Sequence, residues 1–139
     1  MSVDAQGHVS LTSQWFIRPG CEGQVQDAVK KLAANIASQE QGTLTYLVHM
    51  TWTDTGVLQS LPPSVAPSLL FFETYRDADA FKAHVRGPLF KQFVTEYGHC
   101  FISSDPIPND TGPGANPYTT VQFLSQVAGF ALGQPRDES

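Results

Sequence analysis

Apolar and polar residues alternate along two stretches of the chain, and a third stretch is apolar almost throughout. Residues 9–17 and 43–52 alternate with a period of two, which predicts two strands that each bury one face. Residues 69–75 are bulky and apolar up to Glu73, so we expect a central strand that is covered on both faces. The sheet of this protein should therefore be built around this third stretch.

Apolar positions recur every three or four residues in two other parts of the chain. Residues 22–41 carry one apolar stripe, which predicts an amphipathic helix, and we expect Gly42 to end it in the left-handed conformation. A second helical pattern begins after Asp77, a suitable N-cap residue, and continues to Tyr97. Pro88 lacks an amide hydrogen and disfavours helical geometry at the residue before it, so we expect a break at that point.

The C-terminal third of the chain fits two interpretations. Residues 119–132 match either a strand or a helix, and the strand is favoured because a three-stranded sheet gains a partner and Gly129 weakens a helix. The short apolar segment 100–102 is the rival for the position of fourth strand. We expect a domain core over residues 1–104, a linker rich in proline and glycine over 105–118, a last strand within 119–134 and a tail over 135–139.

In this interpretation the elements follow the order strand, helix, strand, strand, helix, strand. That order is typical of the split βαβ, ferredoxin-like α+β fold. The 139 residues are enough for one such domain. Only 15% of the residues are charged, whereas about 25% is usual, which indicates that part of the surface is hidden in an oligomer. We therefore expect a homodimer.

Charge and hydropathy exclude several classes of protein. The net charge is −5 and the eight Lys and Arg residues form no basic cluster, which argues against a nucleic-acid partner because such binding neutralises several phosphates. No segment approaches the ~18 apolar residues that span a bilayer, and the N-terminus lacks the pattern of a signal peptide. We expect a cytoplasmic protein with no membrane contact. No metal-binding spacing, phosphate loop or dinucleotide fingerprint is present, so we also expect no metal and no cofactor.

Residues 53–68 form a long connection that is rich in proline and serine. Connections longer than about 12 residues in compact domains are often lids or binding loops. This one also carries four aliphatic residues that favour burial, namely Val57, Leu58, Leu61 and Val65. We expect it to cover a pocket mouth or the partner subunit.

Several separated motifs resemble those of one known family. Residues 18–20, Arg-Pro-Gly, follow the first strand, and Gly42 lies four residues before Tyr46 at the start of the second. Residues 83–91 read Ala-His-Val-Arg-Gly-Pro-Leu-Phe-Lys. In this order, over residues 9–98, the motifs resemble the quinol-monooxygenase branch of the antibiotic biosynthesis monooxygenase family. The resemblance implies a dimeric α+β barrel that oxidises aromatic or quinol compounds.

Two positions depart from the pattern of that family. Tyr75 stands where many relatives carry tryptophan, and Leu89 replaces the second histidine of an Ala-His-x-x-x-Pro-His-x-Lys pattern. Related heme-degrading enzymes use an asparagine, a tryptophan and a histidine, and the best-matching positions here hold Ser13, Tyr75 and Val94. The resemblance therefore implies neither a mechanism with two histidines nor heme degradation.

His84 and Tyr75 are the candidate catalytic residues. An unperturbed histidine titrates near pH 6.5, which makes His84 the best candidate for a general base. The alternative is a half-buried helix histidine that is hydrogen-bonded to a carbonyl or to water. Tyr75 can orient a substrate hydroxyl, or it can place its ring in the core with the hydroxyl at the rim.

The candidate substrate-binding residues are aromatic, with one exception. Trp15 and Trp52 can form flat apolar walls for an aromatic ligand, although large aromatic residues on strands usually serve packing. Phe72 is a further residue that we expect at the border of the pocket. Tyr46, like Tyr75, can orient a substrate hydroxyl, or it can place its ring in the core with the hydroxyl at the rim. Glu73 is the unusual polar residue of an apolar strand, and it can hydrogen-bond within the site, pair with an arginine or lie exposed at the strand end.

These candidates lead to two hypotheses of function. The first is a cofactor-independent monooxygenase that oxidises a quinol or a polycyclic phenol, because a deprotonated electron-rich phenol can itself give an electron to dioxygen. The protein then has to supply a base, hydrogen-bond donors for the anion and a dry pocket. The alternative is a non-catalytic dimeric protein of the same fold that binds a small hydrophobic metabolite.

Overall fold

The computed structural model describes residues 7–51, 67–102, 119–131 and 133 of the chain. All but the last two residues of the expected lid, 53–68, lie outside this part. Trp52, the expected linker 105–118 and the tail 135–139 lie outside it as well.

Four antiparallel strands form a single sheet within the described residues. They are β1 (Val9–Phe16), β2 (Thr43–Met50), β3 (Ser68–Tyr75) and β4 (Thr119–Leu124), and their order in the sheet is β2-β3-β1-β4. This order, with the two central strands paired side by side, is that of the expected ferredoxin-like α+β fold. The favoured strand in the C-terminal segment is confirmed as β4. Its rival, segment 100–102, contributes one isolated bridge, between Phe101 and Ile17.

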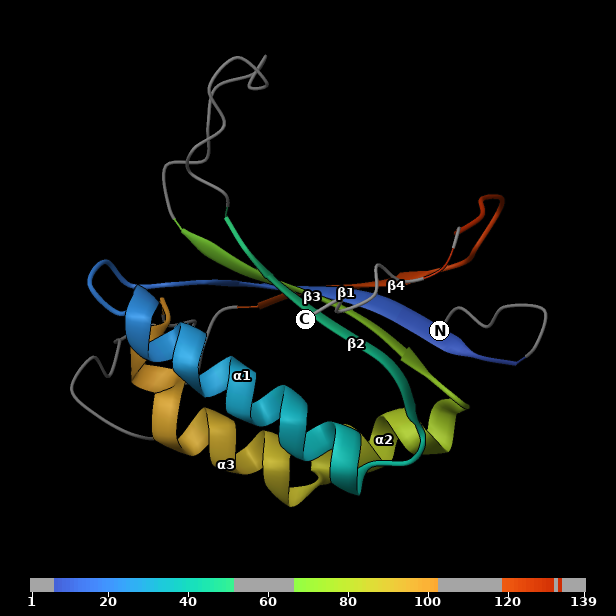
Figure 1. Cartoon of the computed structure of the whole chain (residues 1–139), viewed down its shortest axis with the longest axis horizontal. Coiled ribbons are helices and arrows are strands. Elements are labelled where there is room, and N and C mark those ends of the chain that lie inside the picture. The colour runs from blue at the N-terminus through green and yellow to red at the C-terminus, as the bar shows by residue number, and fades with distance from the viewer. Residues whose placement is uncertain (1–6, 52–66, 103–118, 132, 134–139) are drawn as a thin grey trace, which may run out of the picture.

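Three helices pack against one face of this sheet, as Figure 1 shows. They are α1 (Glu22–Gln39), α2 (Ala78–Arg86) and α3 (Pro88–Tyr97), and a short 3-10 turn, η2 (Gly98–Cys100), follows the last. The predicted N-cap is confirmed, because a side-chain oxygen of Asp77 accepts a hydrogen bond of 2.8 Å from the amide of Ala80. The predicted break is confirmed too, since Pro88 occupies the first position of α3.

The core lies between the sheet and the helices. On β1 and β3 every second residue is buried on this side, as the period of two requires. Trp15 is at the centre of the core, with its ring centroid 5.0 Å from that of Phe101 and 5.7 Å from that of Phe93. The main cluster also includes Ile17, Val25, Val29, Leu32, Ile36, Leu69, Phe71 and Cys100. Trp15 and its phenylalanine neighbours therefore lie under the helices.

The turn after α1 differs from the sequence-based expectation. The helix ends at Gln39 with Glu40 as the C-cap, and Gly42 does not adopt a positive φ, so the left-handed ending is wrong. A Cβ atom at Gly42 would lie only 2.6 Å from the Cβ of Ala80. The glycine is needed because α2 packs directly on this turn, and not because the backbone is left-handed.

The second face of the sheet carries apolar residues that no described helix covers. Leu47 of β2 is 40% exposed and Leu70 of β3 is 39% exposed. Phe72 of β3 lies on this face as well, because it alternates with the buried Phe71 and Glu73. Exposed aliphatic side chains in neighbouring strands are typical of a surface that meets a partner.

Candidate functional site

A cavity of about 230 Å³ lies between the sheet and the helices. Its walls are mainly apolar, and the polar side chains among its lining residues are few. The sheet contributes Leu11, Ser13, Trp15, Tyr46, Phe71, Glu73, Thr119 and Val121, and the helices contribute Leu32, Phe81, His84, Val85, Phe90, Phe93 and Val94. An apolar pocket with a few converging polar groups is the usual form of a small-molecule site.

His84 occupies one wall of this cavity and is almost fully buried, with 3% of its surface exposed. It belongs to the last turn of α2, and its ring centroid lies 5.5 to 5.6 Å from the rings of Tyr46, Tyr75 and Phe90. Its Nδ1 atom lies 2.8 Å from Oε1 of Glu40. The ring is thus fixed by a carboxylate and by aromatic contacts, rather than by a backbone carbonyl.

Glu73 and Tyr75 form a polar pair next to this histidine. Both point from β3 toward the helices, and the hydroxyl of Tyr75 donates a hydrogen bond to the carboxyl of Glu73. Burial raises the pKa of Glu73, although the hydrogen bond from Tyr75 and the charge of His84 act in the opposite direction. Burial, together with the charge of Glu73, also raises the pKa of Tyr75.

Tyr46 approaches the same site from β2. It pairs with Glu73 across the two strands, and its ring packs on Phe71 with a centroid distance of 5.5 Å. Burial raises the pKa of Tyr46, and the charges of Glu73 and Glu40 raise it further. Both tyrosines therefore keep their protons at neutral pH, where a phenol can donate a hydrogen bond but cannot act as a base.

Trp15 of β1 lines the cavity as well. Its indole NH donates a hydrogen bond of 2.7 Å to the hydroxyl of Ser13, and 4% of its surface is exposed. Ring contacts with Phe71 and Phe90 hold the indole in place. The tryptophan therefore serves the core and the cavity wall at the same time.

The structure brings most of the predicted site residues together. Four of them line the cavity, namely Trp15, Tyr46, Glu73 and His84, and Tyr75 touches both Glu73 and His84. Phe72 is the exception, since it lies on the opposite face of the sheet. The expectation that it borders the pocket is wrong, because consecutive strand residues point to opposite faces.

Sequence reasoning missed Glu40 and Phe90. Phe90 lies in the cavity wall beside the histidine, and Glu40 holds the Nδ1 atom of that histidine from 44 residues away in the sequence. One signal pointed to Glu40. A carboxylate at the C-terminal end of a helix is unfavourable for the helix dipole, so such a residue often has another purpose.

The buried carboxyl of Glu73 gives a prediction for stability. A raised pKa means that the folded protein binds this proton more tightly than the unfolded chain does, so stability is greatest below the ordinary value of 4.5 and falls as the pH rises toward the raised value. The slope attributable to one such group is at most about 1.4 kcal/mol per pH unit. Glu73→Gln should remove this dependence and be more stable than the wild type at neutral pH.

Urea denaturation of both proteins between pH 4 and pH 8 measures the effect. Glu96→Gln is a matched control, because it removes an exposed carboxylate that bonds only to Gln92 among the interactions described. If the free energy of unfolding changes with pH in the same way for the wild type and Glu73→Gln, the pKa of Glu73 is not raised by folding and the prediction is wrong.

The described residues contain neither a cluster of possible metal ligands nor a helix that could span a membrane. Among them, no three His, Cys, Asp or Glu side chains lie close enough together to hold a metal ion. None of the helices in the described parts of the chain is long and apolar enough to cross a bilayer.

A family model for antibiotic biosynthesis monooxygenases matches residues 8–96 of the 139. The chain belongs to the antibiotic biosynthesis monooxygenase family. The match covers all elements from β1 to nearly the end of α3, and hence almost every residue that lines the cavity. It confirms the family that the sequence motifs resembled. Among curated protein sequences, none matches this chain significantly.

Solved structures confirm the fold of this monooxygenase family. A candidate antibiotic biosynthesis monooxygenase from Caulobacter crescentus is 19% identical with a TM-score of 0.63, over 88% of this chain and 92% of the other. A protein from Pseudomonas aeruginosa is 16% identical with a TM-score of 0.60, over 88% and 96% of the two chains. A protein from Mycobacterium tuberculosis is 16% identical with a TM-score of 0.58, over 89% and 99%. At such identities the likeness extends to the fold alone.

Proposed function

We propose that this protein is a cofactor-independent monooxygenase that oxidises a quinol or a related phenol with dioxygen. The observation that carries the proposal is the buried His84, which faces an apolar cavity between two protonated tyrosines. A histidine is suited to take a proton near neutral pH, and the tyrosines are suited to donate hydrogen bonds. Membership of a monooxygenase family supports the same reaction class.

The proposed reaction starts with loss of the phenolic proton. His84 takes this proton, and Tyr46 stabilises the resulting oxyanion in surroundings where few water molecules compete. The electron-rich anion then reduces dioxygen, and a carbon–oxygen bond forms at the ring. His84 returns the proton to the outer oxygen. As the oxygen–oxygen bond then breaks, the oxygenated ring carbon loses its hydrogen as a proton, which converts the leaving hydroxide to water and leaves a carbonyl at that carbon. One oxygen atom enters the ring and the other leaves as water, and the substrate supplies all four electrons.

The size of the cavity favours a small substrate. An apolar cavity of about 150 Å³ is enough for benzene. The cavity here measures about 230 Å³, which leaves room for one ring with polar substituents. Among the described residues that line it, Glu73 is the one with an acidic side chain, and burial raises the pKa of this carboxyl. A substituted hydroquinone fits these features better than a polycyclic phenol.

Oxygen uptake with a panel of substituted hydroquinones tests the proposal. We expect consumption of one dioxygen per substrate, and incorporation of one labelled oxygen atom when ¹⁸O₂ is supplied. A chelator present throughout should leave the rate unchanged, and heat-denatured protein sets the rate of autoxidation. Saturable binding of the same compounds without oxygen uptake above that rate would support the alternative, a binding protein of the same fold.

We also propose that the protein is a homodimer in which the helix-free faces of two sheets meet. Leu47 and Leu70 are exposed on this face, and Figure 1 shows the helices on the opposite face of the sheet. Pairing two such faces removes these side chains from water, at about 25 cal/mol per Å² of apolar surface. The low charged fraction of the chain supports the same arrangement.

Sedimentation at micromolar concentration should give about twice the chain mass of 15.1 kDa. The double variant Leu47→Lys, Leu70→Lys places like charges in the proposed interface and should sediment as a monomer. Gln92→Lys adds the same type of charge on the exposed side of α3 and should leave the dimer intact. A wild-type monomer, or a double variant that still dimerises, would contradict the proposed interface.

A further inference from the structure

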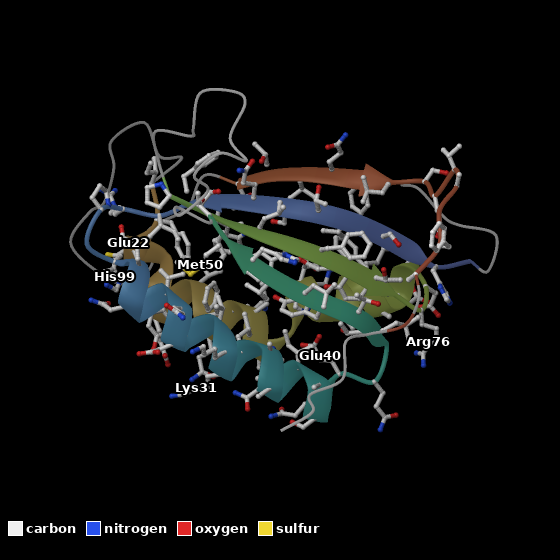
Figure 2. All side chains as sticks on the ribbon, turned by 45° about the horizontal axis from the view of Figure 1, so that its top comes forward. Glu22, Lys31, Glu40, Met50, Arg76 and His99 are labelled. Atoms are coloured by element: carbon white, nitrogen blue, oxygen red, sulfur yellow. The ribbon has the colours of Figure 1, made fainter. Side chains whose placement is uncertain are left out.

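Glu40 occupies a fixed position at the end of α1. Its backbone NH donates to the carbonyl of Ile36, and its side-chain Oε1 accepts a hydrogen bond of 3.1 Å from the hydroxyl of Thr43. The same oxygen lies 2.8 Å from Nδ1 of His84. In Figure 2, Glu40 lies at the end of α1, below β2. One carboxyl oxygen thus serves two partners from different elements.

His84 borders two hollows of different character. On one side is the apolar cavity, which Glu40 does not line. On the other is a polar hollow whose walls include Glu40, Thr43 and Arg76. The side chain of Glu40 is 18% exposed, whereas that of His84 is only 2% exposed. The imidazole therefore separates the cavity from a carboxylate that water can reach.

The hydrogen-bond chemistry of this pair fixes the roles of the two ring nitrogens. An ionised carboxylate only accepts hydrogen bonds, and Oε1 already accepts one from Thr43. The histidine must then donate through Nδ1–H. In the neutral ring, Nε2 is left as the nitrogen with a free electron pair, which is the form that a base requires.

We infer that Glu40 is the positioning residue for His84: it holds the neutral imidazole in the Nδ1–H form and stabilises the imidazolium once Nε2 has taken the substrate proton. This inference rests on the proposed function, in which His84 is the base. The proton balance is closed, because the O–H bond of the phenol breaks as Nε2–H forms. The same proton later leaves with the water. Glu40 keeps its charge throughout and does not touch the substrate.

The other ionisable groups around His84 do not replace Glu40 in this role. Tyr46 and Tyr75 approach from the sheet with raised pKa values and stay neutral. Glu73 has a raised pKa, and its carboxyl is engaged by Tyr75. Arg76 lines the polar hollow and forms an exposed ion pair with Asp77 at 3.6 Å. Of the groups named, Glu40 alone lies within hydrogen-bond distance of Nδ1 among the described contacts.

Two variants and one spectroscopic measurement test the inference. Glu40→Gln keeps the shape of the side chain and removes its charge, and Glu96→Gln removes an equivalent charge on the exposed side of α3. With a hydroquinone that the wild type oxidises, Glu40→Gln should lower kcat roughly 10- to 100-fold with KM within about twofold, the usual loss when the partner that orients a functional histidine is removed. The acid limb of its kcat profile should move to lower pH. Glu96→Gln should match the wild type in kcat, in KM and in the pH profile of kcat.

The tautomer of His84 can be read without any turnover. In ¹⁵N-labelled wild-type protein, long-range ¹H–¹⁵N correlation at a pH where the ring is neutral should assign the proton to Nδ1. In Glu40→Gln the Nε2–H form should become populated. A wild-type ring that carries its proton on Nε2 would overturn the inference, and so would an unchanged kcat in Glu40→Gln while His84→Ala is inactive. If no hydroquinone is oxidised, the proposed function fails, and the tautomer measurement alone decides whether Glu40 positions the ring.

Discussion

His84→Ala is expected to lower kcat for hydroquinone oxidation by about 10² to 10⁴, the usual contribution of a general base. The reason is structural as well as chemical. The imidazole is buried in the wall of the cavity, and the neighbouring tyrosines hold their protons too tightly to replace it. Initial rates of oxygen uptake, corrected for autoxidation, measure the loss.

Lys82→Ala provides the control for this experiment. Lys82 belongs to the same helix, α2, but its side chain is exposed, so the variant tests for general effects of truncating that helix. It should retain the wild-type rate. Full activity of His84→Ala would instead assign the deprotonation to a tyrosine or to the ionisation of the substrate itself.

Trp15→Ala is expected to lose about 3 to 5 kcal/mol of free energy of unfolding, as is typical for the removal of a large aromatic residue from a core. The indole is 4% exposed and contacts four phenylalanine rings, those of Phe71, Phe90, Phe93 and Phe101. Its loss also leaves the buried hydroxyl of Ser13 without its indole partner. Since domains are stable by only about 5 to 15 kcal/mol, this is a large fraction of the total.

Denaturant titration followed by circular dichroism measures this loss, because fluorescence would depend on the residue that is removed. Trp15→Phe keeps an aromatic ring in the cluster and should lose less than the alanine variant. Lys91→Ala, on the exposed side of α3, should stay within about 0.5 kcal/mol of the wild type. If Trp15→Ala were as stable as Lys91→Ala, the four phenylalanine rings would have to fill the space left by the indole, and the prediction would be wrong.

The sequence predicted the elements well, because their signals are local. The period of two in β1, the N-cap at Asp77 and the break at Pro88 each depend on a few neighbouring residues. His84, Tyr75 and Glu73 were found for a related reason, since they interrupt or follow apolar runs where a polar group stands out. Local patterning thus located the elements, whereas only four of the fifteen described residues that line the cavity were among the predicted site residues.

The remaining features depend on contacts between distant segments. Glu40 and His84 lie 44 positions apart in the sequence, so the carboxylate at the helix end is visible locally but its partner is not. The role of Gly42 was misassigned because its constraint is the Cβ of Ala80 on another helix. Phe72 was misplaced for a simpler reason. Both faces of β3 are apolar in the sequence, so only the pairing of the strands in the structure shows which face meets the helices.

The close approach of Gly42 and Ala80 bears on how functions are transferred between relatives. Glu40 and His84 meet only because the turn after α1 touches α2 without an intervening side chain. A lineage that acquired a larger residue at either contact position would keep every residue of the cavity and still separate the carboxylate from the imidazole. Two relatives that share the residues of the cavity therefore do not necessarily share the same chemistry. The two small residues that bring them together should be compared as well.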